Sequence, residues 1–188
     1  GHFLNEYAGQ IKPYVAQRKN VSLHDYYAAI TGIEKEYRLS KVAKVSAFMY
    51  GQDEIKIIYA DALAKNSEVK NGSYSVLVAN PPYSVKGFLE TLSETDRQSF
   101  SLADEVSDVS KTNSIETFFV ERAAQLLQSG GVAAIILPSS ILSNGNIYVK
   151  CREIILKYFD LIAIAEFGSG TFGKTGTNTA TLFMKRKQ

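Results

Sequence analysis

The chain has 188 residues, of which 45% are hydrophobic and 21% are charged. This composition is typical of a soluble globular protein, and we expect residues 1–188 to form one domain with a single buried core. The net charge is only +2, whereas proteins that hold DNA unaided usually carry a marked basic excess. Composition alone therefore does not indicate a nucleic-acid-binding protein.

Cysteine and histidine are too scarce for a disulfide or a metal centre. Cys151 is the only cysteine, so no internal disulfide can form, and we interpret it as a small buried apolar residue rather than a nucleophile. His2 and His24 lack the spacing of metal ligands, and we predict no metal site. No leader and no membrane-spanning apolar run is found, so we expect no membrane contact and a cytoplasmic location.

Apolar strand-like runs alternate with helical patterns along the chain. The predicted elements, in order, are a strand at 28–34, a helix at 36–50, strands at 55–61 and 74–79, a helix at 115–127 closed by Gly130 and Gly131, a strand at 132–137, a helix at 147–158, and strands at 161–167 and 179–184. This alternation predicts an α/β fold with a mostly parallel sheet covered on both faces. The last two strands have no helix between them and are expected to form an antiparallel pair at one edge.

The polar stretch 84–114 interrupts this pattern and contains two helix-like fragments, 88–92 and 96–100. Long segments beside a strand end are often mobile loops that contact the substrate. The alternative is a solvated surface excursion, and the sequence does not favour either interpretation.

Four polar or turn-forming residues stand where predicted strands end: Glu34, Asp61, Asn80 and Pro138. Open α/β sheets bind their ligands at the carboxyl ends of the strands. We therefore expect Glu34 and Asp61 to face one pocket beside Asn80.

The segment Asn80-Pro81-Pro82-Tyr83 follows an apolar strand directly. Pro81 forces Asn80 into an extended conformation, and two successive prolines stiffen the turn. A stiff turn can hold the Asn80 side-chain oxygen and a nearby carbonyl as two acceptors for an exocyclic amine, while Tyr83 lies against the flat ring of that ligand. The plain alternative is a turn that ends a strand and contains Asn80 by chance.

The stretch Val76–Tyr83 resembles the catalytic motif of amino-group DNA methyltransferases. It is most similar to the modification subunits of type I restriction–modification systems and to related adenine methylases. The resemblance implies a Rossmann-like sheet of the S-adenosylmethionine-dependent methyltransferases with a C-terminal antiparallel hairpin. It also implies that the catalytic residues are Asn80, Pro81, Pro82 and Tyr83.

Further motifs extend the resemblance over nearly the whole chain. In the family pattern, the acid at Glu34 holds the ribose hydroxyls of S-adenosylmethionine, and Asp61-Ala62 contacts the adenine of the cofactor. Phe172 stands where an aromatic residue touches the flipped base. Gly1 matches only the tail of the first, glycine-rich motif, so we expect a fragment that lacks the first strand and binds the cofactor weakly or not at all.

Each of these residues also has a simpler interpretation. Glu34 can be an acid at a helix N-terminus, favoured by the helix dipole. Asp61 can cap a helix that begins at Ala62. Phe172 can lie buried under the last hairpin.

The resemblance implies methyl transfer from S-adenosylmethionine to N6 of an adenine flipped out of double-stranded DNA, within a restriction–modification system. It implies a specificity subunit as partner, and a restriction subunit in addition. Two alternatives remain open. One is a methyltransferase that acts on protein glutamine or on guanine of ribosomal RNA, and the other is a non-catalytic scaffold fragment.

Overall fold

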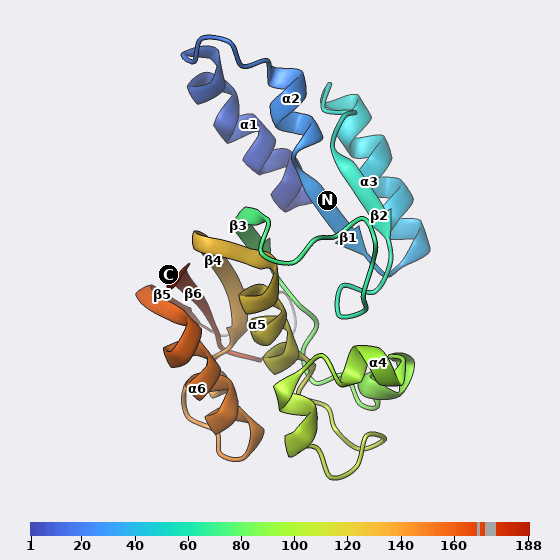
Figure 1. The fold of residues 1–188 in the computed structure, drawn as a ribbon, viewed down its shortest axis with the longest axis vertical. Helices are drawn as coiled ribbons and strands as arrows, with labels where there is room; N and C mark the ends of the chain where they lie inside the picture. Colours follow the sequence, from blue (N-terminus) through green and yellow to red (C-terminus); the bar gives the residue numbers. More distant parts are fainter. Residues whose placement is uncertain (169, 172–175) are drawn as a thin grey trace. The chain divides into compact units, whose positions relative to one another are not determined.

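The computed structural model describes residues 1–168, 170–171 and 176–188. These residues form two compact units, Gly1–Ala64 and Lys65–Gln188, each built from helices and strands (Figure 1). None of the described helices is long and apolar enough to span a membrane. The predicted single domain stays a prediction.

The first unit contains two parallel strands, β1 (Thr31–Glu34) and β2 (Lys56–Tyr59). Glu34 is paired with Tyr59 at the carboxyl end of this two-stranded sheet. Both strands lie inside the predicted ranges 28–34 and 55–61. Glu34 ends β1 and Asp61 follows β2 by two residues, so the predicted placement of both acids at strand ends is confirmed.

Three helices accompany these strands: α1 (His2–Ala16), α2 (Leu23–Ala28) and α3 (Tyr37–Met49). The Ser22 hydroxyl caps α2 by accepting the Asp25 N–H at 3.1 Å. The Glu36 carboxylate caps α3 by accepting the Leu39 N–H at 2.6 Å. The helical pattern predicted α3 within one residue at each end, whereas α1, which contains Pro13 in its interior, was not predicted.

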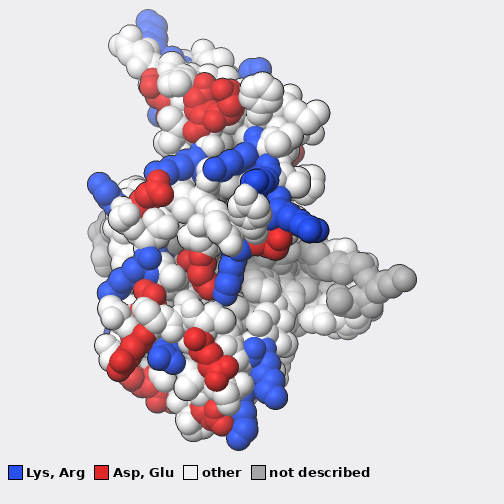
Figure 2. All heavy atoms as spheres, turned by 90° about the vertical axis from the view of Figure 1, so that its right-hand side faces the viewer, with Lys and Arg blue, Asp and Glu red and all other residues white. Residues whose placement is uncertain are grey.

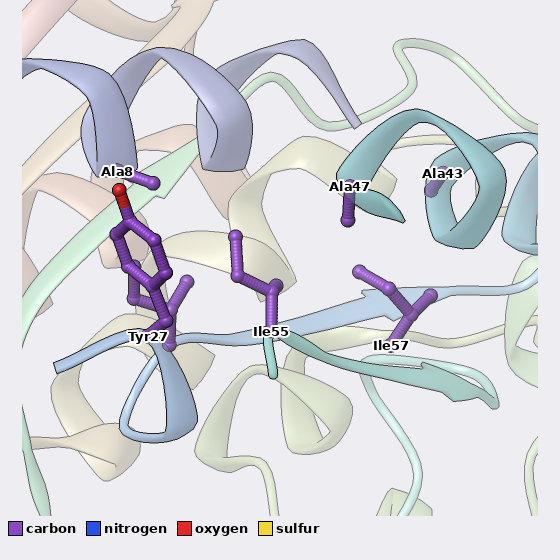
Figure 3. Packing of buried hydrophobic residues seen from close by; sticks show 7 residues of the cluster. Ala8, Tyr27, Ala43, Ala47, Ile55 and Ile57 are labelled. Atoms are coloured by element: carbon purple, nitrogen blue, oxygen red, sulfur yellow. The ribbon is translucent and has the colours of Figure 1, made fainter. Parts of the chain in front are cut away.

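Buried side chains from both strand regions and all three helices form the core of this unit. Figure 3 shows Tyr27, Ile55 and Ile57 directed toward Ala8, Ala43 and Ala47 of the covering helices. Small alanines on α1 and α3 allow the helices to approach the strands closely, so the larger isoleucine and tyrosine side chains fill the space between them.

The second unit contains a four-stranded sheet in the order β3-β4-β6-β5. Its strands are β3 (Tyr74–Ala79), β4 (Leu127–Pro138), β5 (Phe159–Phe167) and β6 (Thr179–Arg186). β3 and β4 are parallel, while β6 runs antiparallel to both β4 and β5. The predicted antiparallel pair at one edge is therefore confirmed, and so is the α/β fold class.

Helices α5 (Ile115–Leu126) and α6 (Ile147–Tyr158) lie against one face of this sheet (Figure 1). On the other face, Val76, Val78 and Phe183 are 39%, 44% and 39% exposed. The prediction that both faces of the sheet are covered therefore does not hold within this unit. Apolar runs show which strands can be buried on both faces, but they do not specify what covers them.

The segment 84–114 contains three short helices: η1 (Phe88–Thr91), α4 (Glu94–Arg97) and η2 (Ser101–Glu105). Phe88 and Phe100 are buried and pack edge-to-face against Phe118 of α5, with ring centroids 5.0 and 5.4 Å apart. The segment therefore contributes to the core and is not a fully solvated excursion. Its contact with a substrate stays a prediction.

The start of β4 differs from the prediction. The sequence placed a loop at Gly130 and Gly131 and a strand from Val132, whereas β4 begins at Leu127, opposite Tyr74. Gly130 has φ +75°, and a Cβ atom on Gly131 would lie 3.0 Å from the Tyr74 carbonyl oxygen. The two glycines thus form an irregularity inside the strand, where a turn was expected.

We predict that Phe118→Ala lowers the free energy of unfolding by about 3–5 kcal/mol, because the substitution removes a fully buried ring and leaves a cavity that the surrounding side chains fill only in part. Urea denaturation measures the effect. Leu156→Ala, on an exposed position of α6, serves as control and should change stability by less than about 0.5 kcal/mol. Equal stability of the Phe118 variant and the parent protein would show that segment 84–114 does not depend on this cluster.

Candidate active site

Three chain segments of the second unit meet at one edge of its sheet. Asn80 follows the last residue of β3, Pro138 is the last residue of β4, and Thr179 at the start of β6 pairs with Pro138. The Ser139 N–H donates to the Asn178 carbonyl oxygen at 2.9 Å. The predicted strand-end positions of Asn80 and Pro138 are thus confirmed, and the stretch before β6 reaches the same edge.

The turn Asn80–Tyr83 presents an exposed amide above a buried proline. Asn80 is exposed, Pro81 is buried and Tyr83 is partly buried. The Tyr83 hydroxyl lies 3.0 Å from Asn80 Oδ1 and 3.2 Å from the Ile136 carbonyl oxygen of β4. With one proton, the hydroxyl can donate to either oxygen at a time.

Burial raises the pKa of Tyr83, and the nearby Glu116 carboxyl raises it further. The hydroxyl is therefore a donor at neutral pH. The sequence predicted Tyr83 as a flat platform, but its hydrogen bonds to Asn80 and to β4 were not anticipated. When it donates to Ile136, the hydroxyl links the turn to β4, and when it donates to Asn80, the amide oxygen keeps a second acceptor position.

A buried acid, Glu116, contacts the residue that follows the turn. Its carboxyl group is fully buried, accepts the Ser84 N–H at 3.2 Å and accepts the Tyr148 hydroxyl at 2.7 Å. Burial and the bond to Glu116 raise the pKa of Tyr148 to about 12. Sequence reasoning missed Glu116 because its two partners are each 32 residues away.

In the first unit, Glu34 and Asp61 lie at the same edge of the β1–β2 pair. The Ala60 N–H donates to the Glu34 carbonyl oxygen at 3.1 Å, which holds the ends of the two strands together. Asp61 Oδ1 accepts the Leu63 N–H at 2.9 Å, and Asp61 Oδ2 pairs with Lys35 Nζ at 2.7 Å. The ion pair with Lys35 was not predicted.

Glu34 and Asp61 both lie close to turns, and α3 begins shortly after Glu34. Glu36, not Glu34, caps α3, while Glu34 Oε1 accepts the Glu36 N–H at 2.9 Å before the helix begins. No helix begins at Ala62, where the chain makes a turn that the Asp61 side chain closes. The helix-cap interpretation of Asp61 is therefore wrong. Glu34 lies just before α3 and contacts its N-cap residue, so its interpretation as an acid at a helix N-terminus is not contradicted. Both carboxylates are held by local turns.

Two predicted site residues have less structural support. Gly1 is the N-cap residue of α1 and lies close to α3, where an added Cβ would come within 3.4 Å of Ala43. Phe172 lies outside the described residues. The predicted pocket that joins Glu34 and Asp61 to Asn80 stays a prediction, because these residues belong to different units.

Cys151 is fully buried, and burial raises the pKa of its thiol to about 12. This supports its interpretation as a core residue rather than a nucleophile. Within residues 1–168, 170–171 and 176–188, no group of three His, Cys, Asp or Glu side chains is arranged to hold a metal ion.

Comparison with known proteins adds independent evidence. A family model described as N-6 DNA Methylase matches residues 1–188. The type II restriction enzyme and methyltransferase RM.BcgI of Heyndrickxia coagulans is 23% identical over 171 residues, which is 90% of this chain but 23% of that protein.

Two solved structures have a similar fold. The M protein of the type I restriction enzyme EcoKI is 19% identical, with a TM-score of 0.74, over 99% of this chain and 38% of that one. A Listeria monocytogenes protein described as a class I S-adenosylmethionine-dependent methyltransferase is 16% identical, with a TM-score of 0.69, over 84% of this chain and 44% of that one. This chain thus spans less than half the length of each relative.

These structural likenesses confirm the predicted methyltransferase fold class, and the family model and the RM.BcgI relative confirm the predicted resemblance to adenine DNA methylases. Because the family model covers the full length of the sequence, this chain belongs to the N-6 DNA methylase family.

Proposed function

We propose that this chain forms part of the catalytic core of an adenine-specific DNA methyltransferase that uses S-adenosylmethionine. The observation that carries the proposal is the Asn80–Tyr83 turn, which presents an exposed amide oxygen beside an aromatic ring at the carboxyl edge of β3 and β4. Family membership supports the same conclusion.

Asn80 activates the exocyclic amine of the target base in this mechanism. The amine is a poor nucleophile because its lone pair is delocalised into the ring. Asn80 Oδ1 accepts one amine hydrogen, and a backbone carbonyl of the Pro81–Pro82 turn accepts the other, so the nitrogen becomes more tetrahedral. Its hydrogens become more acidic as positive charge develops on the nitrogen, and these two bonds therefore stabilise the transition state more than the ground state.

Tyr83 holds the base once it has left the duplex. An adenine inside the double helix cannot present its amine to a methyl donor, so base flipping is required. Tyr83 is only partly buried, and its hydroxyl anchors the ring to Asn80 or Ile136; we propose that the base stacks on this ring. Phe172 is proposed as a second contact to the flipped base.

The acids of the first unit fit the expected cofactor. S-adenosylmethionine, when bound, supplies an electrophilic methyl group. Glu34 and Asp61 are held by local turns at the ends of adjacent parallel strands, where a carboxylate can accept hydrogen bonds from ribose hydroxyls and an adenine amine. We assign Glu34 to the ribose of the cofactor, and Asp61 and Ala62 to its adenine. We assign Gly1 to the end of the glycine-rich motif that binds the cofactor.

The proposed partners are double-stranded DNA, a specificity subunit and a restriction subunit. The net charge is +2, and the face drawn in Figure 2 shows lysine and arginine side chains interspersed with aspartate and glutamate. Such a surface offers limited phosphate neutralisation, which supports a separate subunit as the main DNA contact. A solved protein structure that is 20% identical to this chain comes from work on the complex assembly of a type I restriction–modification system.

Asn80→Ala, in the intact protein assembled with its partners, should reduce methyl transfer to adenine by about a hundredfold or more. It should leave the affinity for S-adenosylmethionine unchanged, because Asn80 is proposed to bind the target base and not the cofactor. Asn113→Ala, another exposed asparagine of the same unit, is the control and should keep the parental rate. Parental activity of the Asn80 variant, or methylation of a protein substrate in place of DNA, would contradict the proposed reaction.

The two functions of Tyr83 can be separated by substitution. Tyr83→Ala removes a stacking contact worth about 1–3 kcal/mol, so the flipped base should return to the duplex sooner and turnover should fall. Tyr83→Phe keeps the ring and loses only the hydroxyl, so its loss in turnover should stay below about tenfold. Fluorescence of 2-aminopurine at the target position reports the flipped state, and equal signals from the two variants would exclude a stacking role.

Glu34→Ala should weaken S-adenosylmethionine binding by about 10–100-fold, the equivalent of losing hydrogen bonds to a charged group. Glu36→Ala is a matched control two residues away, because Glu36 caps α3. That control should cost about 1 kcal/mol of stability and leave affinity unchanged. Calorimetric titration with S-adenosylmethionine measures the affinity of both variants. Equal affinity of the Glu34 variant and the parent protein would remove Glu34 from the cofactor site.

A further inference from the structure

A strained residue directly follows the Asn80–Tyr83 turn. Ser84, the first residue after Tyr83, has φ +54°. Residues other than glycine rarely adopt this left-handed conformation, and they keep it only where the surrounding structure enforces it. A contact with the surrounding structure must therefore hold the Ser84 backbone in this left-handed conformation.

Glu116 contacts this backbone directly. Glu116 Oε2 accepts the Ser84 N–H at 3.2 Å, and Glu116 Oε1 accepts the Tyr148 hydroxyl at 2.7 Å. The side chain is 0% exposed and belongs to the first turn of α5, where the helix dipole favours an acid. A carboxyl group buried so completely needs such partners, and one of them is the exit of the turn.

We propose that Glu116 is a positioning residue that fixes the Asn80–Tyr83 turn through the Ser84 N–H, with Tyr148 holding the carboxyl group from its other side. The inference rests on the proposed catalytic function of that turn. Glu116 does not touch the base in this scheme. It prevents the peptide after Tyr83 from relaxing, and so keeps the Asn80 oxygen and the Tyr83 ring at the spacing that methyl transfer requires.

The same helix provides a matched control. Glu121 is also buried, and its carboxylate accepts the Ser101 N–H at 2.7 Å, the Ser101 hydroxyl at 2.7 Å and the Leu102 N–H at 3.1 Å. Glu121 thus holds backbone N–H groups as Glu116 does, but in η2 rather than in the turn. Substitutions at Glu121 measure what the loss of a buried acceptor costs the fold alone.

The test compares Glu116→Met, Glu116→Gln and Glu121→Met in the intact protein with its partners. Glu116→Met fills the same space without an acceptor and should lower single-turnover methyl transfer at least about tenfold, as expected for a misplaced reacting group. The KM for S-adenosylmethionine should not change. Glu116→Gln should restore most of the rate, because its amide oxygen can accept from Ser84 while its NH2 donates to Tyr148. Glu121→Met should keep the parental rate in the folded fraction.

Amide hydrogen exchange of the peptide that contains Ser84 is a readout independent of activity. Exchange should accelerate in Glu116→Met and stay near the parental level in Glu116→Gln and Glu121→Met. If Glu116→Met does not fold, Glu116→Asp replaces it, because the shorter side chain withdraws the carboxylate from Ser84 and should give the same two changes.

The outcomes separate the two claims. A parental rate or unchanged exchange at Ser84 in the Glu116 variants overturns the positioning role, even where Asn80→Ala is inactive. An equal rate loss in Glu121→Met shows a purely structural effect and also overturns it. A parental rate in Asn80→Ala defeats the proposed function, and the inference falls with it.

Discussion

The pairing of β4 with its two neighbours is the constraint on which the second unit depends. β4 is parallel to β3 and antiparallel to β6, so the ends of β3 and β4 and the start of β6 lie at one edge. A register slip of one residue in β4 would exchange the buried and exposed faces of that strand. Ile135 and Leu137, which are completely buried against the helices, resist such a slip. The position of Asn80 therefore follows from core packing in β4.

Two buried acids of helix α5 hold the backbone of segment 84–114, which begins next to this edge of the sheet. Nearly all side chains of α5 are buried, including these two acids, which a helix inside a core does not ordinarily carry. Each acid accepts backbone N–H groups from segment 84–114, at Ser84 and at Ser101 and Leu102. Because unpaired buried carboxyl groups are costly, these contacts specify one path for the segment.

The sequence predicted what depends on local pattern and missed what depends on distant contacts. The strand Tyr74–Ala79 and the helix Ile147–Tyr158 have the predicted bounds, because the strand is an apolar run between Gly72 and Pro81, and the helix has helical apolar spacing and follows Gly145. Gly131 was misread as a loop residue, since only the partner strand shows that it sits against a carbonyl group. The support of Ser84 by Glu116 spans 32 residues, and no local pattern indicates it.

The two acceptors within reach of the Tyr83 hydroxyl explain how the turn can be tightly held and still receive a substrate. Asn80 Oδ1 lies at 3.0 Å and the Ile136 carbonyl oxygen at 3.2 Å, nearly equal distances for a single proton. When a ligand amine donates to Asn80, the hydroxyl can keep its bond there, because the amide oxygen has two lone pairs, or turn to Ile136. Neither arrangement leaves a buried donor unpaired, so the exchange avoids the main cost of rearranging a buried polar group. In the proposed reaction, the site can thus remain ordered before the base arrives and change little when the base binds.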